Sequence, residues 1–228
     1  MALILNLETA TTVCSVALGE NGKLLSIKEI NKDYTHAENL TVFIEQVLAS
    51  ANVKLTHLDA VAISKGPGSY TGLRIGTSTA KGLCYALNKP LIAINTLKQI
   101  SLGFSTSNPH SSNLYCPMID ARRMEVYCAI YDSENNEIRK TSAEIIDEYS
   151  FADILEKHRI FFFGDGAAKC KIKLANHPNA IFVDNILPSA KNMIQLSEQN
   201  FNSAGFEDVA YFEPFYLKDF VAGGKKGQ

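Results

Sequence analysis

The order of its apolar patterns constrains this 228-residue chain more than any other feature. Short apolar runs, which are typical of buried strands, alternate with segments whose apolar residues recur every three or four positions, as on one face of a helix. The first half opens with three strands, two of them joined at the hairpin signal Asn21-Gly22. Helix, strand, helix, strand and a short helix follow. The predicted strands are 2–7, 14–18, 23–30, 59–64 and 90–95, and the longer helices are 38–51 and 73–87.

The second half approximates the same order again. Its predicted strands are 114–119, 125–132, 137–143, 160–163 and 180–183, and its predicted helices are 150–157 and 189–199. The sequence therefore indicates an α/β fold made of two copies of one unit. The cleft between such copies is the expected ligand site, because loops from both sheets converge there.

The boundary between the two copies is expected at residues 105–113. This segment contains no aliphatic or aromatic side chain except the ring of His110, which is typical of a linker. We therefore predict a first subdomain at 1–104 and a second at 114–228, with residues 222–228 as a flexible tail.

Composition narrows the class of protein. Apolar residues make up 46% of the chain, enough for a packed core, and the net charge of −2 provides no global attraction to RNA. The first residues lack a basic leader region, and no apolar run approaches the ~18 residues of a membrane helix. The cysteines are far apart and mostly within apolar runs, so we expect buried thiols in a cytoplasmic protein without membrane contact. They are Cys14, Cys84, Cys116, Cys128 and Cys170.

A glycine-rich segment between a predicted strand and a predicted helix is the richest motif. Two interpretations stand open: a structural turn with Thr71 as the helix cap, or a loop whose free amides cradle a phosphate. It is not a Walker loop, because the glycine spacing differs and no Gly-Lys-Ser/Thr follows. The residues of this motif loop are Gly66, Pro67, Gly68, Ser69, Tyr70, Thr71 and Arg74.

The helix that follows has small residues at Gly72, Gly76 and Ala80. Small residues at four-residue steps allow another helix to approach closely, and glycine costs a helix up to about 1 kcal/mol relative to alanine. The stripe therefore indicates a packing role, either within this chain or at a protein interface.

Candidate ligands and catalytic groups are few. His36 and Glu38 lie near the start of the first helix, but position 40 is Leu, so the second ligand of a helical metal pair is missing. No Ser-His-Asp or Cys-His arrangement can be singled out, and we expect neither catalytic residues nor a metal site. Tight turns after strands supply candidate cleft residues, although each by itself is better explained as an ordinary turn. They are Glu8, Thr9, Asp120, Gly164 and Gly166.

Several segments together resemble the TsaB family, also called YeaZ. The most specific is 65–76, with the sequence KGPGSYTGLRIG, and the others are 5–10, 14–18, 36–40, 119–127 and 214–218. The family usually has Asp in place of Glu8 and Arg in place of Lys218. The resemblance implies two actin-like (ASKHA, ribonuclease H-like) subdomains, each a mixed sheet with flanking helices.

The resemblance also implies a role in a bacterial complex that makes threonylcarbamoyladenosine (t6A) in tRNA. There the transfer belongs to the paralogue TsaD, which holds a metal through a His-x-Glu-x-His helix, and TsaE supplies an ATPase. Leu40 stands where the second metal-binding His would be, so an accessory subunit rather than an enzyme is expected. Such a subunit needs no cofactor of its own, although ATP or ADP can bind at the interface of the complex. It contacts tRNA only indirectly, through the complex.

Family members resembling this chain pair with TsaD, or with themselves, through the first two helices. The residues expected at that interface are His36, Leu40, Gly72, Gly76 and Ala80. Two rival functions remain open: a glycoprotease-like (M22) metallopeptidase, and a small-molecule phosphotransferase of the actin-like class. Glu8 without a following glycine counts against the phosphotransferase.

Overall fold

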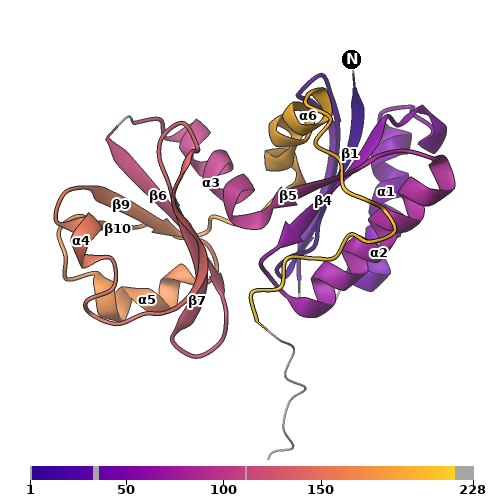
Figure 1. Ribbon diagram of the computed structural model, residues 1–228. Helices are drawn as coiled ribbons and strands as arrows, with labels where there is room; N and C mark the ends of the chain where they lie inside the picture. Colours follow the sequence, from indigo (N-terminus) through magenta and orange to yellow (C-terminus); the bar gives the residue numbers. More distant parts are fainter. Residues whose placement is uncertain (1, 33–35, 111, 219–228) are drawn as a thin grey trace, which may run out of the picture.

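The computed structural model describes residues 2–32, 36–110 and 112–218, which form two lobes (Figure 1). The first lobe is a five-stranded mixed sheet with the order β3-β2-β1-β4-β5, in which β1, β2 and β3 are antiparallel and β1, β4 and β5 are parallel. Its strands are β1 (Leu3–Glu8), β2 (Val13–Glu20), β3 (Lys23–Asn31), β4 (Ala60–Gly66) and β5 (Leu91–Asn95). Every residue of β1 is buried, as expected for a strand covered on both faces.

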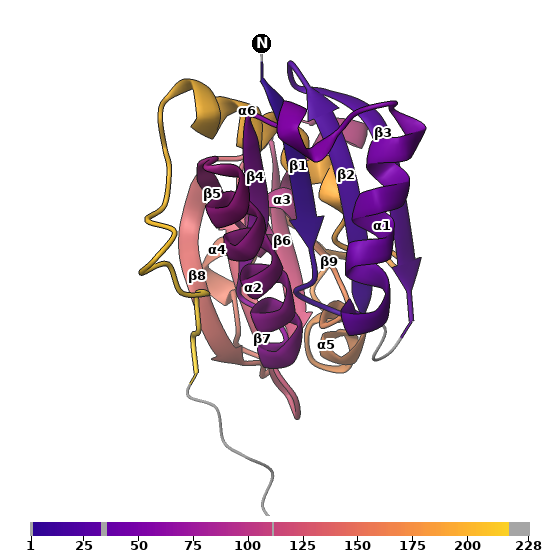
Figure 2. The same cartoon turned by 90° about the vertical axis from the view of Figure 1, so that its right-hand side faces the viewer.

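Two helices cover the outer face of this sheet side by side (Figure 2). They are α1 (His36–Ser50) and α2 (Tyr70–Leu87), and a short 3-10 turn, η1 (Leu55–His57), lies between them in sequence. Apolar residues of both helices join side chains of the central strands in one core, which includes Leu7, Leu40, Ile44, Ile63 and Ala80. The 3.6-residue period thus buries one stripe of each helix and leaves the opposite stripe exposed.

The second lobe has the same topology, with the order β10-β9-β6-β7-β8. Its strands are β6 (Asn113–Asp120), β7 (Glu125–Tyr131), β8 (Glu137–Ile145), β9 (Arg159–Phe163) and β10 (Ala180–Phe182), and α4 (Ala152–Leu155) and α5 (Ala167–Leu174) cover its outer face. The predicted duplication is therefore confirmed. Helix α5 was not predicted, although its buried Ala167, Cys170 and Leu174 have helical spacing.

The layer between the two sheets is built reciprocally. Helix α3 (Thr96–Ser107) follows the first sheet in sequence but packs its apolar residues against the inner face of the second. The 3-10 turn η2 (Ala190–Met193) and α6 (Ile194–Asn202) follow the second sheet and pack against the first. Each lobe thus completes its core with an element of the other half of the sequence.

This exchange corrects the predicted domain boundaries. The linker expected at 105–113 is shorter, because α3 continues to Ser107 and β6 begins at Asn113. The second unit does not extend to the C-terminus, because Ala190, Met193 and Ile194 pack onto the first sheet with Ile4 and Ala62. The tail predicted at 222–228 lies outside the described residues. Local sequence patterns could not show this return, since it depends on contacts between distant segments.

Residues 206–218, called here the C-terminal strap, run back over the edge of the first lobe, as the yellow segment of Figures 1 and 2 shows. The backbone nitrogen of Glu207 donates to the carbonyl oxygen of Leu91 at 2.9 Å, and that of Phe215 donates to the carbonyl oxygen of Lys65 at 2.7 Å. The strap therefore covers the edge of β5 and ends beside the motif loop. Among the described residues, no helix is both long and apolar enough to cross a membrane.

Candidate functional site

The motif loop joins β4 to α2 and is held in place by two distant segments. The backbone nitrogen of Ser69 donates to the carbonyl oxygen of Ala10 at 2.6 Å. A Cβ at Gly68 would lie 2.2 Å from that same oxygen, and a Cβ at Gly66 would lie 2.8 Å from the carbonyl oxygen of Phe215 in the strap. Gly66 also has a φ of 109°, which side chains rarely adopt. These glycines are needed because three parts of the chain meet here.

Ser69, not Thr71, caps helix α2. The Ser69 hydroxyl oxygen accepts a hydrogen bond from the backbone nitrogen of Gly72 at 3.3 Å. The prediction of Thr71 was wrong by two residues, because the helix begins at Tyr70 and Thr71 already lies in its first turn. Between the two interpretations left open, these contacts support the structural turn.

The small-residue stripe of α2 faces the interior of the chain. A Cβ at Gly72 would lie 2.1 Å from the carbonyl oxygen of Thr9, and one at Gly76 would lie 2.2 Å from Thr9 Oγ1. Ala80 is fully buried in the first core. The prediction of Gly72, Gly76 and Ala80 as a partner interface is therefore wrong. The alternative of packing within the chain is correct, because Thr9, directly after β1, occupies the space that the missing side chains leave.

The start of α1 is also turned inward. His36 is 8% exposed, and its Nε2 donates to the carbonyl oxygen of Thr11 at 2.7 Å, while Nδ1 is buried without a hydrogen-bond partner. Leu40, 1% exposed, packs in the core. As interface residues, both predictions are corrected, since neither side chain is presented at the surface. Across 2–32, 36–110 and 112–218, no group of three or more His, Cys, Asp or Glu side chains is placed to hold a metal ion.

Glu8 and Thr9 are completely buried at the end of the first strand, and Glu8 lies against helix α3. Glu8 accepts hydrogen bonds from the backbone nitrogen of Ala10 and, at 2.8 Å, from Gln99 Nε2 of α3. Complete burial raises the pKa of Glu8 to about 7, although hydrogen bonds from Ser64, Ala10 and Gln99 oppose the shift. The Thr9 hydroxyl donates to the carbonyl oxygen of Gly72 at 2.8 Å. Glu8 and Thr9, which were predicted to line a cleft, are therefore buried inside the protein.

A second, partly buried network attaches the returning η2 to the first sheet. The Ser189 hydroxyl donates to Glu29 Oε2 at 2.6 Å, and the Ser15 hydroxyl donates to the same oxygen at 3.0 Å. Ser15 Oγ in turn accepts from the backbone nitrogen of Ala190 at 3.0 Å. These bonds satisfy the polar groups of Ser15 and Ser189, so they fix the returning segment to the first sheet.

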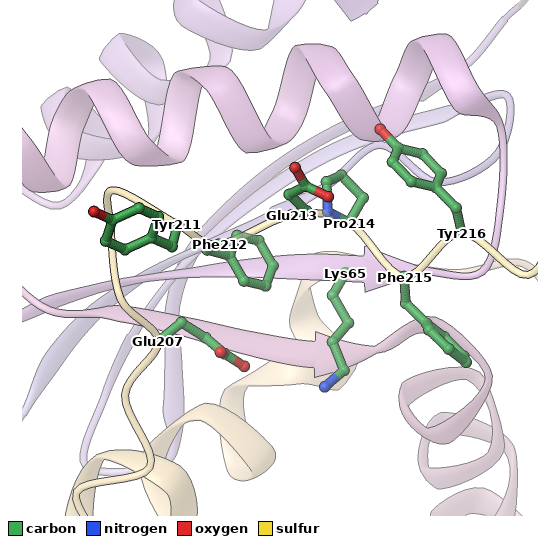
Figure 3. A pocket seen from close by; sticks show the side chains of 8 residues that line it. All are labelled: Lys65, Glu207, Tyr211, Phe212, Glu213, Pro214, Phe215 and Tyr216. Atoms are coloured by element: carbon green, nitrogen blue, oxygen red, sulfur yellow. The ribbon is translucent and has the colours of Figure 1, made fainter. Parts of the chain in front are cut away.

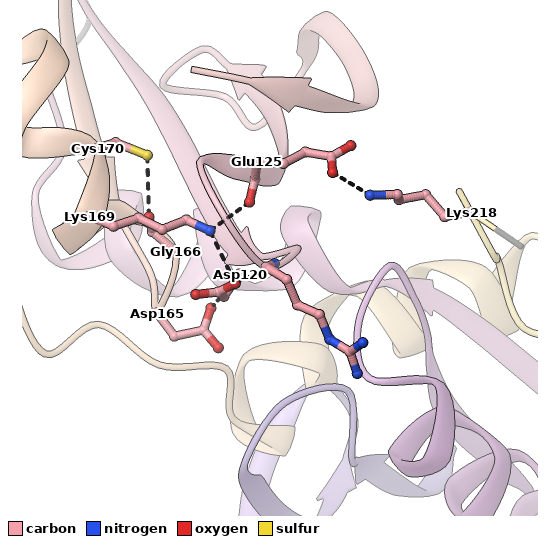
Figure 4. Close-up of polar contacts among 8 residues, drawn as sticks. Asp120, Glu125, Asp165, Gly166, Lys169, Cys170 and Lys218 are labelled. Carbon is pink, nitrogen blue, oxygen red and sulfur yellow. Dashed lines mark hydrogen bonds and ion pairs between the residues drawn. The ribbon is translucent and has the colours of Figure 1, made fainter. Parts of the chain in front are cut away.

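The other predicted cleft residues gather at the turn between β6 and β7 (Figure 4). Asp120 Oδ1 accepts hydrogen bonds from Lys169 Nζ at 3.1 Å and from the backbone nitrogen of Arg122 at 2.6 Å. A Cβ at Gly164 would lie 2.2 Å from the carbonyl oxygen of Met118, and one at Gly166 would lie 2.8 Å from the backbone of Ile119. The glycines thus allow the turn after β9 to pack on β6. No hydrogen bond or ion pair of the described residues joins this group to Glu8 or Thr9.

The larger of two pockets on the strap is open, has a volume of about 500 Å³ and is lined by aromatic side chains, Lys65 and two glutamates (Figure 3). Its lining residues are Lys65, Glu207, Tyr211, Phe212, Glu213, Pro214, Phe215 and Tyr216. A second pocket of about 340 Å³ lies between the strap and α2 and also includes Tyr216. Sequence reasoning missed both, although 214–218 was part of the family resemblance.

Comparison with known proteins gives consistent matches over nearly the whole chain. The family model described as TsaD, tRNA N6-adenosine threonylcarbamoyltransferase, matches residues 29–223. The tRNA threonylcarbamoyladenosine biosynthesis protein TsaB of Escherichia coli strain K12 is 30% identical over 97% of both chains. Its namesake in Haemophilus influenzae is 27% identical over 97% of this chain and 96% of its own.

Solved structures agree with the actin-like fold of two mixed sheets with flanking helices. YeaZ from Pseudomonas aeruginosa has a TM-score of 0.80 at 26% identity, with 95% of this chain and 100% of that chain covered. The activator of the 2-hydroxyisocaproyl-CoA dehydratase from Clostridium difficile shares the fold alone, with a TM-score of 0.52 at 8% identity over 89% of this chain and 96% of its own. From the near-complete coverage and the identity to the curated relatives, the chain belongs to the TsaB (YeaZ) family.

Proposed function

We propose that this protein is a non-catalytic partner subunit in cytoplasmic t6A synthesis on tRNA, pairing with a TsaD-like transferase and working with a TsaE-like ATPase. The names of the E. coli and H. influenzae relatives support the pathway. The observation that carries the accessory role is the start of α1. Leu40 is buried in the core, at the position where a metal-binding helix would need a second imidazole. His36 already donates its Nε2 hydrogen to the carbonyl oxygen of Thr11.

The outward faces of α1 and α2 support a docking role for this lobe. Helix α1 carries Glu38 and Glu45 and no Lys or Arg, whereas α2 carries Arg74 and Lys81 and no acidic residue. A second α1–α2 pair in antiparallel orientation would set each helix against one of opposite charge. Such a surface suits a related α1–α2 pair of the transferase, or a second copy of this chain when the transferase is absent.

Two exposed side chains are the candidate anchors of this interface. Val42 of α1 is 43% exposed and Tyr85 of α2 is 86% exposed. They replace the buried residues that sequence reasoning had assigned to the interface. The proposal places no nucleotide site within this chain. ATP or ADP would bind at the interface or in the partner.

A reconstituted modification reaction tests the proposal. The chain is mixed with the TsaD-like paralogue, the TsaE-like ATPase, tRNA, the threonylcarbamoyl donor and ATP, and each component is omitted in turn. Modification should depend on every protein and should require pairing with the paralogue. Modification that persists without this chain would end the subunit proposal.

Surface variants make the test specific to the proposed face. Val42→Glu with Tyr85→Glu should weaken pairing with the paralogue at least about 30-fold, because hot-spot side chains contribute about 2 kcal/mol or more. Leu24→Glu with Ile138→Glu is the matched control, since these side chains are 46% and 55% exposed on β3 and β8. The control should pair normally. Equal pairing by both double variants would refute the assignment of the face.

The same preparation distinguishes the rival functions. Peptide cleavage by the isolated chain, abolished by a chelator, would favour the metallopeptidase. ATP turnover with a small acceptor by the isolated chain would favour the phosphotransferase. Under our proposal the isolated chain has neither activity.

A further inference from the structure

The turn between β6 and β7 has an unusual backbone for its sequence. Arg122 and Arg123 have φ values of 70° and 49°, so two consecutive arginines occupy the left-handed region that favours Gly and Asn. Both side chains are exposed. Such strain persists only where the surroundings determine the conformation, and it is concentrated at functional positions.

Hydrogen bonds fix this turn from several sides. The backbone nitrogen of Ala121 donates to the carbonyl oxygen of Glu125 at 3.1 Å, and the backbone nitrogen of Glu125 donates to the carbonyl oxygen of Arg122 at 3.2 Å. Asp120 Oδ1 accepts from the backbone nitrogen of Arg122, and Lys169 Nζ donates to the carbonyl oxygen of Glu125 at 2.7 Å. The turn is therefore a rigid support for the two guanidinium groups.

The nearby carboxylates are largely neutralised by lysines, not by these arginines. Asp120 pairs with Lys169, and Glu125 pairs with Lys218 at the end of the strap (Figure 4). Among the described residues, no ion pair involves Arg122 or Arg123. The basic patch thus contains four basic side chains and three acidic ones, and it is positive in a chain whose net charge is −2. Its basic members are Arg122, Arg123, Lys169 and Lys218, and its acidic members are Asp120, Glu125 and Asp165.

The strap connects this basic patch to aromatic rings. Tyr216, two residues before Lys218, lies 5.2 Å from the ring of Tyr70 in the motif loop, and the guanidinium of Arg74 lies 4.3 Å over the Tyr70 ring. Tyr216 also lines both pockets of the strap. Basic groups followed by an accessible aromatic ring are the elements with which proteins hold single-stranded nucleic acid.

We propose that Arg122 and Arg123 contact the phosphodiester backbone of a single-stranded stretch of the tRNA, with Tyr216 as a stacking surface for a base. The inference rests on the proposed function and deepens it, since it makes this subunit a direct contact of the tRNA. A free nucleotide fits less well, because the basic groups are spread along an exposed turn and strap. An extended polyanion can reach the turn and the ring together.

Salt-dependent binding tests the proposal on the complex of the full chain with its paralogue. The probe is a fluorescently labelled, unmodified tRNA transcript, followed by anisotropy between about 50 and 200 mM salt. Arg122→Asn with Arg123→Gly should weaken binding about tenfold and reduce the slope of log affinity against log salt by about 1.4, as expected for two lost contacts to single-stranded phosphates. Tyr216→Leu should weaken binding about fivefold or more with an unchanged slope, because stacking is not ionic.

Two controls keep the result interpretable. Asn and Gly tolerate left-handed φ, so the turn variant should unfold at a temperature no lower than the original protein. Lys140→Gln with Arg159→Gln removes two exposed basic side chains elsewhere on the second lobe and should leave both affinity and salt slope near the original values. Equal losses in the turn variant and this control would overturn the site, because the effect would then be general charge.

Other outcomes separate this inference from the proposed function. Unchanged RNA affinity and slope in the turn variant would overturn the site even if the complex assembles and modifies tRNA. Loss of ATP binding with retained RNA binding would assign the turn to a nucleotide instead. Loss of pairing with the TsaE-like ATPase, with RNA binding intact, would assign it to a protein partner. A complex that fails to modify tRNA with the original chain would refute the proposed function, whatever the variants do.

Discussion

Gln99 Nε2 donates a hydrogen bond of 2.8 Å to Glu8 Oε2, and this bond joins the end of the first strand to the helix that leads into the second lobe. Gln99 Oε1 lies 3.5 Å from the backbone nitrogen of Ser189, which begins the returning segment. A buried carboxyl with a pKa of about 7 therefore sits where the halves of the chain meet.

Protonation of Glu8 should make stability depend on pH. In the unfolded chain its carboxyl titrates near pH 4.5, and in the folded protein near pH 7, so between these values the folded state binds more protons. Stability should therefore fall as pH rises through this window and level off above it, by about 3 kcal/mol from this group. Glu8→Gln removes the titration, so the stability of the variant relative to the original should rise with pH. Urea unfolding at about pH 5 and about pH 8 measures this difference, and parallel pH profiles for the two proteins would contradict it.

Glycines of one helix should respond in opposite directions to the same substitution. Gly72→Ala should destabilise the fold by about 1–3 kcal/mol, because the new Cβ would lie 2.1 Å from the Thr9 carbonyl oxygen. Gly82→Ala should stabilise it by up to about 1 kcal/mol, since nothing lies within 4 Å of a Cβ there. Chemical denaturation of both variants is the measurement. Similar effects at the two positions would show that the stripe does not face β1.

The cap of α2 can be located by two single substitutions. Ser69→Ala should cost about 1 kcal/mol, because it removes the acceptor for the Gly72 backbone nitrogen. Thr71→Ala should change stability by less than about 0.5 kcal/mol, since Thr71 is exposed within the first turn. The unfolding temperatures of the two variants show whether the Ser69 or the Thr71 hydroxyl caps the helix. A larger loss at Thr71 would restore the interpretation that the sequence favoured.

The strap should loosen when its anchor on α2 is removed. Lys81 Nζ donates to the carbonyl oxygens of Ala210 and Phe212 at 3.1 and 3.0 Å. Lys81→Met should raise the population of the detached strap, with about fivefold faster chymotrypsin cleavage at its aromatic residues, equivalent to about 1 kcal/mol of local stability. Lys54→Met, a change of an exposed lysine outside the strap, is the control. Cleavage at the same rate in both variants would show that Lys81 does not anchor the strap.

Much of the fold was predictable from local patterns. The alternation of strand and helix periods predicted the duplicated order of elements, and the predicted limits of most strands differ by one or two residues from those observed. The helices of the second half were harder to predict, because they are shorter than those of the first half. Helix α5 is only eight residues long, and its lysines at 169, 171 and 173 obscured the helical spacing of its buried residues. Those lysines form ion pairs with Asp120, Asp184 and Glu148.

The sequence by itself determined the element order, the family and the absence of a second imidazole on α1, because these are properties of neighbouring residues. Only the tertiary structure decided which way each functional candidate faces. Helical spacing places Gly72, Gly76 and Ala80 on one stripe, but the segment that covers the stripe comes from β1, 63 residues earlier in the case of Thr9 and Gly72. The buried hydrogen bond between Gln99 and Glu8 joins residues 91 positions apart. Contacts of that range are set by how the whole chain packs, which no local pattern records.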